Sequence, residues 1–65
     1  MMNVIEKRFH SALAAARSWR RLEREARRQG ICHREIQARA SLDRCLTEAH
    51  ALRAQMRAEL GREAA

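Results

Sequence analysis

Gly30 is the residue that most restricts how this chain can fold. The sequence of 65 residues has no proline and only one other glycine, Gly61, so little else interrupts its helical pattern. Glycine lacks a Cβ and readily adopts the left-handed conformation that ends a helix. Arg27 and Arg28 come just before it, where cations meet the negative end of a helix dipole. The sequence therefore predicts that a helix ends at Gln29 and that the chain reverses direction.

The residues after this glycine predict that a second helix begins at once. Ile31 is expected to pack back on Ala26, as the Schellman ending of a helix favours. With Cys32 as the cap of the second helix, Glu35 is its third residue and reaches back to the cap amide. Ile31 and Ile36 would then form a hydrophobic staple. Cysteine is a poor cap, so a start shifted by one residue also fits, and either connection makes the helices antiparallel neighbours.

Apolar residues recur every three or four positions before and after the turn, which is the spacing of one face of a helix. The first predicted helix spans residues 3–29, with Asn3 as its cap. The second spans residues 33–60 after a turn at 30–32, and Gly61 permits its end before fraying residues. The two lines of contact, which we call seams, are Ile5, Phe9, Ala12, Ala16, Trp19 and Ala26 in the first helix and Ala38, Leu42, Cys45, Ala49, Leu52 and Met56 in the second.

Folding the two seams about the turn leaves apolar side chains at their edges. Ala26 is expected beside Ile36, and Trp19 beside Leu42. A chain of this length buries a small fraction of its surface, and one stripe on each helix does not hide the leucines at the edges. We predict one all-α domain over residues 1–65, an antiparallel two-helix hairpin that dimerises into a four-helix arrangement. The apolar surface of hairpin and dimer comprises Phe9, Leu13, Trp19, Leu22, Leu42, Leu46, Leu52 and Met56, with Gly30 and Ile31 at the turn.

A run of arginines is the strongest charge feature of the sequence. Residues 1–28 contain eight Lys and Arg against three Glu, which gives this part of the chain a net charge of plus five. The remaining residues contain six Arg against five acidic residues, a net charge of plus one, and the whole chain carries plus six. The residues predicted to bind a partner are Arg17, Arg20, Arg21, Arg24 and Arg28. They would steer the protein toward an acidic protein surface or toward phosphates. The alternative is a solvated face, partly neutralised by Glu23 and Glu25.

The sequence gives no basis for catalysis, for a metal or cofactor site, or for a membrane span. It has no glycine-rich loop and no nucleophile beside a base at helical spacing. The spacing of Cys32, Cys45 and His50 matches no usual set of metal ligands, and the two cysteines lie about 20 Å apart on one predicted helix, too far for a disulfide. No segment is apolar for long enough to cross a bilayer. We expect a cytoplasmic protein that is not an enzyme and needs no cofactor.

The pattern favours a protein over a nucleic acid as the partner. A helix-turn-helix motif is excluded because the two predicted helices are long and fold back on each other. Phe9 and Trp19 both fall on the seam, so no aromatic platform is left for stacking on bases. Trp19 is interpreted as a core residue or, on the rim of an alanine-rich hairpin, as an anchor for a partner.

In length and layout, the whole chain resembles small phage-encoded helical-hairpin regulators that bind host proteins, of the type that blocks activators of quorum sensing. It also resembles the helical-hairpin co-chaperones of type III secretion needle subunits. The first resemblance implies a protein-binding module that docks on a larger regulatory protein and inhibits or sequesters it. This is the function we expect, with a basic nucleic-acid-associated protein and a secretion co-chaperone as alternatives.

Overall fold

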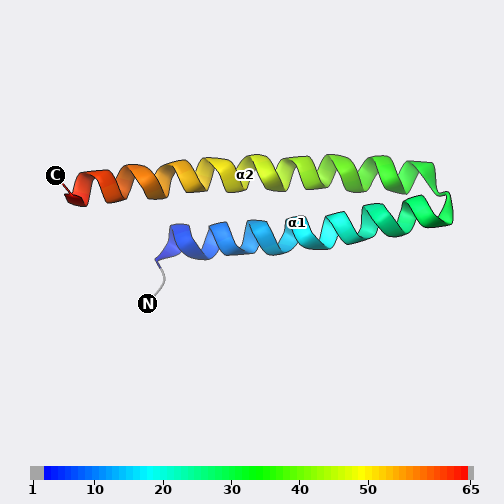
Figure 1. Cartoon of the computed structure of the whole chain (residues 1–65), viewed down its shortest axis with the longest axis horizontal. Coiled ribbons are helices and arrows are strands. Elements are labelled where there is room, and N and C mark those ends of the chain that lie inside the picture. Colours follow the sequence, from blue (N-terminus) through cyan, green and yellow to red (C-terminus); the bar gives the residue numbers. More distant parts are fainter. Residues whose placement is uncertain (1–2, 65) are drawn as a thin grey trace.

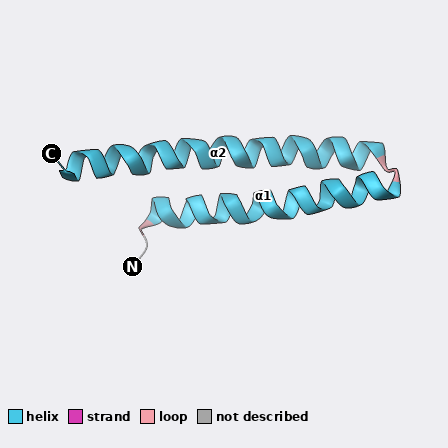
Figure 2. Ribbon diagram, in the orientation of Figure 1, coloured by secondary structure: helices cyan, strands magenta, loops and turns pink. Residues whose placement is uncertain are grey.

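The computed structural model shows two α-helices folded back on each other (Figure 1). It describes residues 3–64, except for the side chains of the last two of these. Helix α1 spans Val4–Gln29 and helix α2 spans Cys32–Ala64. The described residues form no strand, and loop is confined to the N-terminal end and the bend between the helices (Figure 2). The molecule measures 53 × 20 × 12 Å, as one layer of two helices does, which confirms the predicted all-α antiparallel hairpin.

The start of α1 is fixed by Asn3, as the sequence predicts. The Asn3 backbone is extended, and its side-chain oxygen accepts a 2.8 Å hydrogen bond from the N–H of Glu6. Its carbonyl oxygen accepts a 3.1 Å bond from the N–H of Lys7. Asn3 is therefore the cap rather than the first helical residue, and it provides a partner for an amide that would otherwise lack one within the helix.

The bend has the Schellman geometry predicted for it. Gly30 lies in the left-handed region, with φ 71° and ψ 26°. Its N–H donates to the carbonyl oxygen of Arg27 at 3.2 Å, and the N–H of Ile31 donates to the carbonyl oxygen of Ala26 at 3.0 Å. These two bonds use carbonyls that the end of α1 would otherwise leave unpaired, so the reversal needs no longer loop.

The start of α2 differs from the prediction by one residue. Cys32 is the first helical residue, and Ile31 occupies the cap, since its carbonyl oxygen accepts a 3.1 Å bond from the N–H of Glu35. The predicted capping box is wrong, because the carboxylate of Glu35 binds Arg27. The predicted staple is also wrong, because Ile36 is 70% exposed. Ile31 thus takes part in both helix ends: its N–H bonds to the last turn of α1, and its carbonyl oxygen accepts the first hydrogen bond of α2.

The end of α2 also differs, because the helix continues through Gly61 to Ala64. Gly30 is the one glycine with a positive φ, so Gly61 keeps the right-handed conformation of its neighbours. No proline follows to stop the helix. The predicted end of the helix at Gly61 is therefore wrong, whereas the fraying predicted from Arg62 onward stays a prediction, and Ala65 lies outside the described residues. The end of α2 extends past the start of α1 (Figure 1).

The two glycines predict opposite effects of the same substitution. A Cβ at either position meets no atom within 4 Å, so backbone conformation alone decides the outcome. Gly30→Ala is expected to lower the free energy of unfolding by about 1–2 kcal/mol, because an L-residue is strained in the left-handed region. Gly61→Ala is expected to raise it by about 0.5–1 kcal/mol, because glycine inside a helix is unfavourable. Urea denaturation followed by circular dichroism measures both, and equal effects of the two variants would contradict the helix ends described above.

The core between the helices consists mostly of alanine. Its members are 2–6% exposed and comprise Ala12, Ala16, Ala26, Ala38, Leu42, Ala49 and Leu52. All seven were predicted seam residues, but the predicted pairing of Ala26 with Ile36 is wrong. Ala26 instead lines one depression together with Trp19 and Ala38, while Ile36 faces outward. Small side chains let the helix axes approach closely, and they also bury little apolar surface.

Candidate functional site

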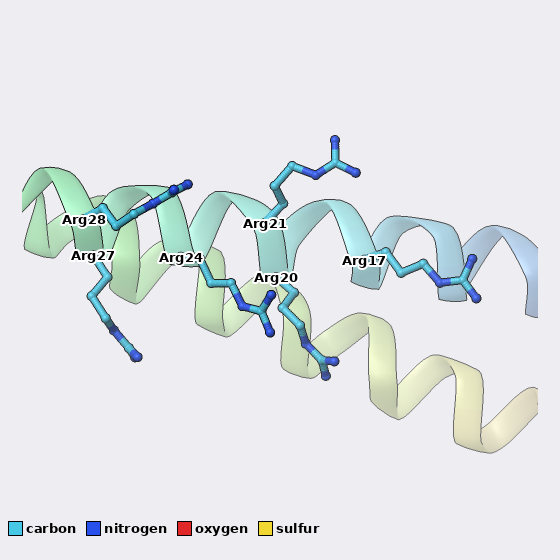
Figure 3. A pocket seen from close by; sticks show the side chains of 6 residues that line it. All are labelled: Arg17, Arg20, Arg21, Arg24, Arg27 and Arg28. Atoms are coloured by element: carbon cyan, nitrogen blue, oxygen red, sulfur yellow. The ribbon is translucent and has the colours of Figure 1, made fainter.

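Six arginine side chains of α1 line one open depression, which we call the arginine surface (Figure 3). Its members are Arg17, Arg20, Arg21, Arg24, Arg27 and Arg28. The structure thus brings together the five arginines predicted to bind a partner and adds Arg27. All six are exposed, and the side chains spread from the helix in several directions (Figure 3). All six members of the surface come from α1.

Arg24 lies at the centre of this surface and has arginine at each of its four helical neighbours. Arg20 and Arg21 precede it by four and three residues, and Arg27 and Arg28 follow it by three and four. Residues at these spacings are adjacent on a helix surface, and each like-charge pair destabilises a helix by roughly 0.2–0.5 kcal/mol. The centre of the surface therefore concentrates positive charge at a cost to the stability of α1.

Arg27 differs from the other members because it has a carboxylate partner. Its Nε donates a 2.9 Å hydrogen bond to the Glu35 carboxylate across the bend. This bond, the attraction to Glu35 and a weaker attraction to Glu23 raise the pKa of the Arg27 guanidinium, against slight desolvation. Among the described residues, the other five arginines form no ion pair with a carboxylate. They are available to a partner, while Arg27 links the two helices.

A second ionic cluster explains how an acidic residue sits on the seam of α1. The Glu23 side chain is only 12% exposed, and Arg39 of α2 approaches its carboxylate at 3.7 Å. Arg39 also lies 3.5 Å from the carboxylate of Asp43, one turn further along α2. Position 23 lies four residues after Trp19 and three before Ala26, so it falls on the seam between them. An acidic side chain there requires a nearby cation, so the sequence carried a signal for this pairing. The ion-pair partner of Glu23 is therefore Arg39 of α2, and its effect on the arginine surface is the weaker attraction to Arg27.

The flank with Trp19 is a different surface from the one that carries the arginines. Trp19 is half-buried and lines a depression with Leu22, Ala26 and Ala38. Trp19 is thus at the edge of the buried core, a position compatible with both interpretations given above, core residue and anchor for a partner. Ser41 is 5% exposed, and its hydroxyl accepts a 3.0 Å hydrogen bond from Arg44. Sequence reasoning missed this buried serine.

The predicted apolar surface divides into three levels of burial. Leu42 and Leu52 are buried, and Leu22 is 48% exposed. The half-buried members are Phe9, Leu13, Trp19, Leu46 and Met56. Val4, Ile36 and Leu60 are each at least 64% exposed. Apolar surface is therefore left open, as expected for a lone hairpin, but it is spread over several faces and forms no single strip.

The histidines and cysteines do not form a metal site within residues 3–62, the range whose side chains are described. No group of three or more His, Cys, Asp or Glu side chains there is arranged to hold a metal ion. His10 is exposed and packs edge-on against the ring of Phe9, with centroids 5.8 Å apart. Cys32 is exposed and Cys45 is half-buried, and both are free thiols. No helix in this part of the chain is both long enough and apolar enough to cross a membrane.

Comparisons with protein-family models, with curated proteins and with solved structures each found no significant match to this chain. The charge and geometry of the arginine surface are therefore the main guide to function.

Proposed function

We propose that this chain is a non-enzymatic protein-binding module that docks on a larger regulatory protein and inhibits or sequesters it. The arginine surface is the part that meets the partner. The observation that carries the proposal is the position of Arg24, whose four helical neighbours are all arginine. Natural proteins accept local arrangements that oppose stability at functional sites. The arginines around Arg24 repel one another in the free protein, and carboxylates of a partner placed among them would replace this repulsion with attraction.

The chemistry of arginine supports a protein partner. A guanidinium group is planar and always charged, and it binds a carboxylate through two parallel hydrogen bonds. Five of these groups have no such partner among residues 3–62, whose side chains the structure describes. Complementary charge of this kind raises the association rate and selects the partner, while apolar contacts add affinity.

The exposed area of the chain supports a need for a partner. The chain exposes 5396 Å², whereas a compact protein of 7.6 kDa exposes about 4,300 Å². The excess of about 1,100 Å² is larger than the about 800 Å² that each protein contributes to a standard interface. A second copy of the chain would use the same excess, so homodimerisation stays a prediction, which sedimentation equilibrium over a range of concentrations tests.

The experiment compares the wild-type chain with the Arg21→Glu/Arg24→Glu variant as bait in lysate of the source cell, with and without nuclease. We expect one regulatory protein to bind the wild type after nuclease treatment and to be lost by the variant. The purified partner should then bind directly in calorimetry, and addition of the chain should reduce its activity.

Nucleic acid is the competing outcome of this experiment. Capture that disappears with nuclease, together with direct binding of duplex DNA or RNA that falls steeply with salt, would contradict the proposal. A partner that resembles a secretion needle subunit and is required for the chain to stay folded would instead favour the co-chaperone alternative.

A further inference from the structure

The arginine surface continues toward the start of α1 as an apolar surface on the same face of the helix. Side chains spaced by three or four residues share one face. The face that runs along the arginine surface, which we call the docking stripe, comprises Phe9, Leu13, Arg17, Arg20, Arg24 and Arg28. The first two are half-buried and the four arginines are exposed. The end of the stripe nearer the start of α1 is therefore apolar, with two residues, and the longer remainder is cationic, with four arginines.

We infer that the docking stripe binds one antiparallel helix of a partner protein, acidic in its N-terminal half and apolar in its C-terminal half. The inference rests on the proposed function and specifies the element that would meet the arginine surface. The stripe spans about 28 Å from Phe9 to Arg28 at 1.5 Å per residue, which corresponds to about 20 residues of a partner helix.

The spacing of the arginines favours a helix over an extended peptide. Successive cations of the stripe are three or four residues apart, so they follow the helical pitch of about 5.4 Å. Carboxylates at the same spacing on a second helix stay in register with every arginine. On a strand, side chains of one face recur every 6.4–6.8 Å or so, and the mismatch grows to roughly 3–4 Å over three intervals.

The orientation follows from the helix dipoles. The arginines lie in the C-terminal half of α1, so an antiparallel partner places its N-terminal half beside them. Acidic side chains stabilise the N-terminal turns of the helix that carries them, and oppositely directed dipoles attract. In a parallel arrangement, the acidic residues would lie at the C-terminal end of the partner helix, where its dipole disfavours them.

The apolar end of the stripe argues against a phosphate backbone as the ligand. Phe9 and Leu13 meet no apolar group on a duplex, since the backbone presents charged phosphates. Trp19, the other aromatic residue, is half-buried and lines the depression on a different flank. Phe9 lies eight residues, about two helical turns, before Arg17, so no aromatic side chain stands among the arginines to stack on bases.

The inference is tested with the full chain and two labelled helical peptides of about 20 residues that have identical composition. One peptide carries glutamates at helical spacing in its N-terminal half and leucines in its C-terminal half, and the other has the halves exchanged. We expect the acidic-first peptide to bind at least about tenfold more tightly in fluorescence anisotropy. Arg24→Glu should weaken its binding at least tenfold, whereas the matched control Arg57→Glu, with the same charge change on exposed α2 surface, should change it less than twofold.

Equal affinity of the two peptides would overturn the inference, because it would mean that charge alone decides binding. Tighter binding of a duplex DNA of similar length, also lost in Arg24→Glu, would overturn it in favour of nucleic acid. If the cellular partner still depends on Arg21 and Arg24 while neither peptide order is preferred, this inference fails and the proposed function stands.

Discussion

Leu42→Ala is expected to lower the free energy of unfolding by about 2–5 kcal/mol. Leu42 is 2% exposed and is one of only two leucines among the buried core residues, the rest being alanines that contribute little apolar area each. A single domain of this size has only a few kcal/mol of stability. We therefore expect the variant to lose most of its helical circular dichroism signal at room temperature.

The control is Leu60→Ala, which removes the same atoms from a side chain that is 64% exposed. It should change the free energy of unfolding by no more than about 0.5 kcal/mol. Equal effects of the two variants would show that the contact between α1 and α2 does not provide the stability of the hairpin.

Arg24→Glu is expected to stabilise the free protein while it abolishes binding to the partner. The substitution turns four like-charge neighbours into four attractive pairs, which should raise the free energy of unfolding by about 1.6–4 kcal/mol at low salt. The same change places a carboxylate against the acidic surface of the partner. We expect the affinity to fall at least about 100-fold, equivalent to roughly 2.7 kcal/mol.

Thermal unfolding at low and high salt measures the first effect, and calorimetry with the partner measures the second. The stabilisation should shrink with added salt, because the charges are exposed and screened. Arg57→Glu again supplies the matched charge change and should leave partner binding unaltered. A less stable Arg24→Glu variant would contradict the view that the arginine surface is electrostatically unfavourable in the free protein.

Much of this fold follows from local rules that a sequence expresses directly. The absence of proline, the single left-handed glycine and the periodicity of alanine and leucine were enough to predict the hairpin and its core. The five predicted arginines also come together, because residues at helical spacing share a face whenever the helix forms. These features depend on residues close in sequence, so no knowledge of distant contacts was needed.

The predictions that proved wrong concern positions where two local rules favoured different structures, or where the outcome depended on contacts between residues far apart in the sequence. The position of Glu35 predicted a capping box at the start of α2, but its carboxylate forms an ion pair with Arg27 across the bend instead. Gly61 suited a helix end, but strong helix formers surround it and no cap competes. The exposure of Ile36 and the burial of Ser41 depend on how α2 is rotated against α1, which the spacing of apolar residues defines only approximately.

The unequal lengths of the two helices have a consequence for the dynamics of the molecule. Both helices meet at the bend, so the last residues of α2 extend past α1 and have no neighbouring helix to pack on (Figure 1). Their amide protons are protected by intrahelical hydrogen bonds alone and should exchange with solvent first. Protection in a deuterium-exchange experiment should therefore rise progressively from the carboxyl end of the chain toward Leu52 and Leu42.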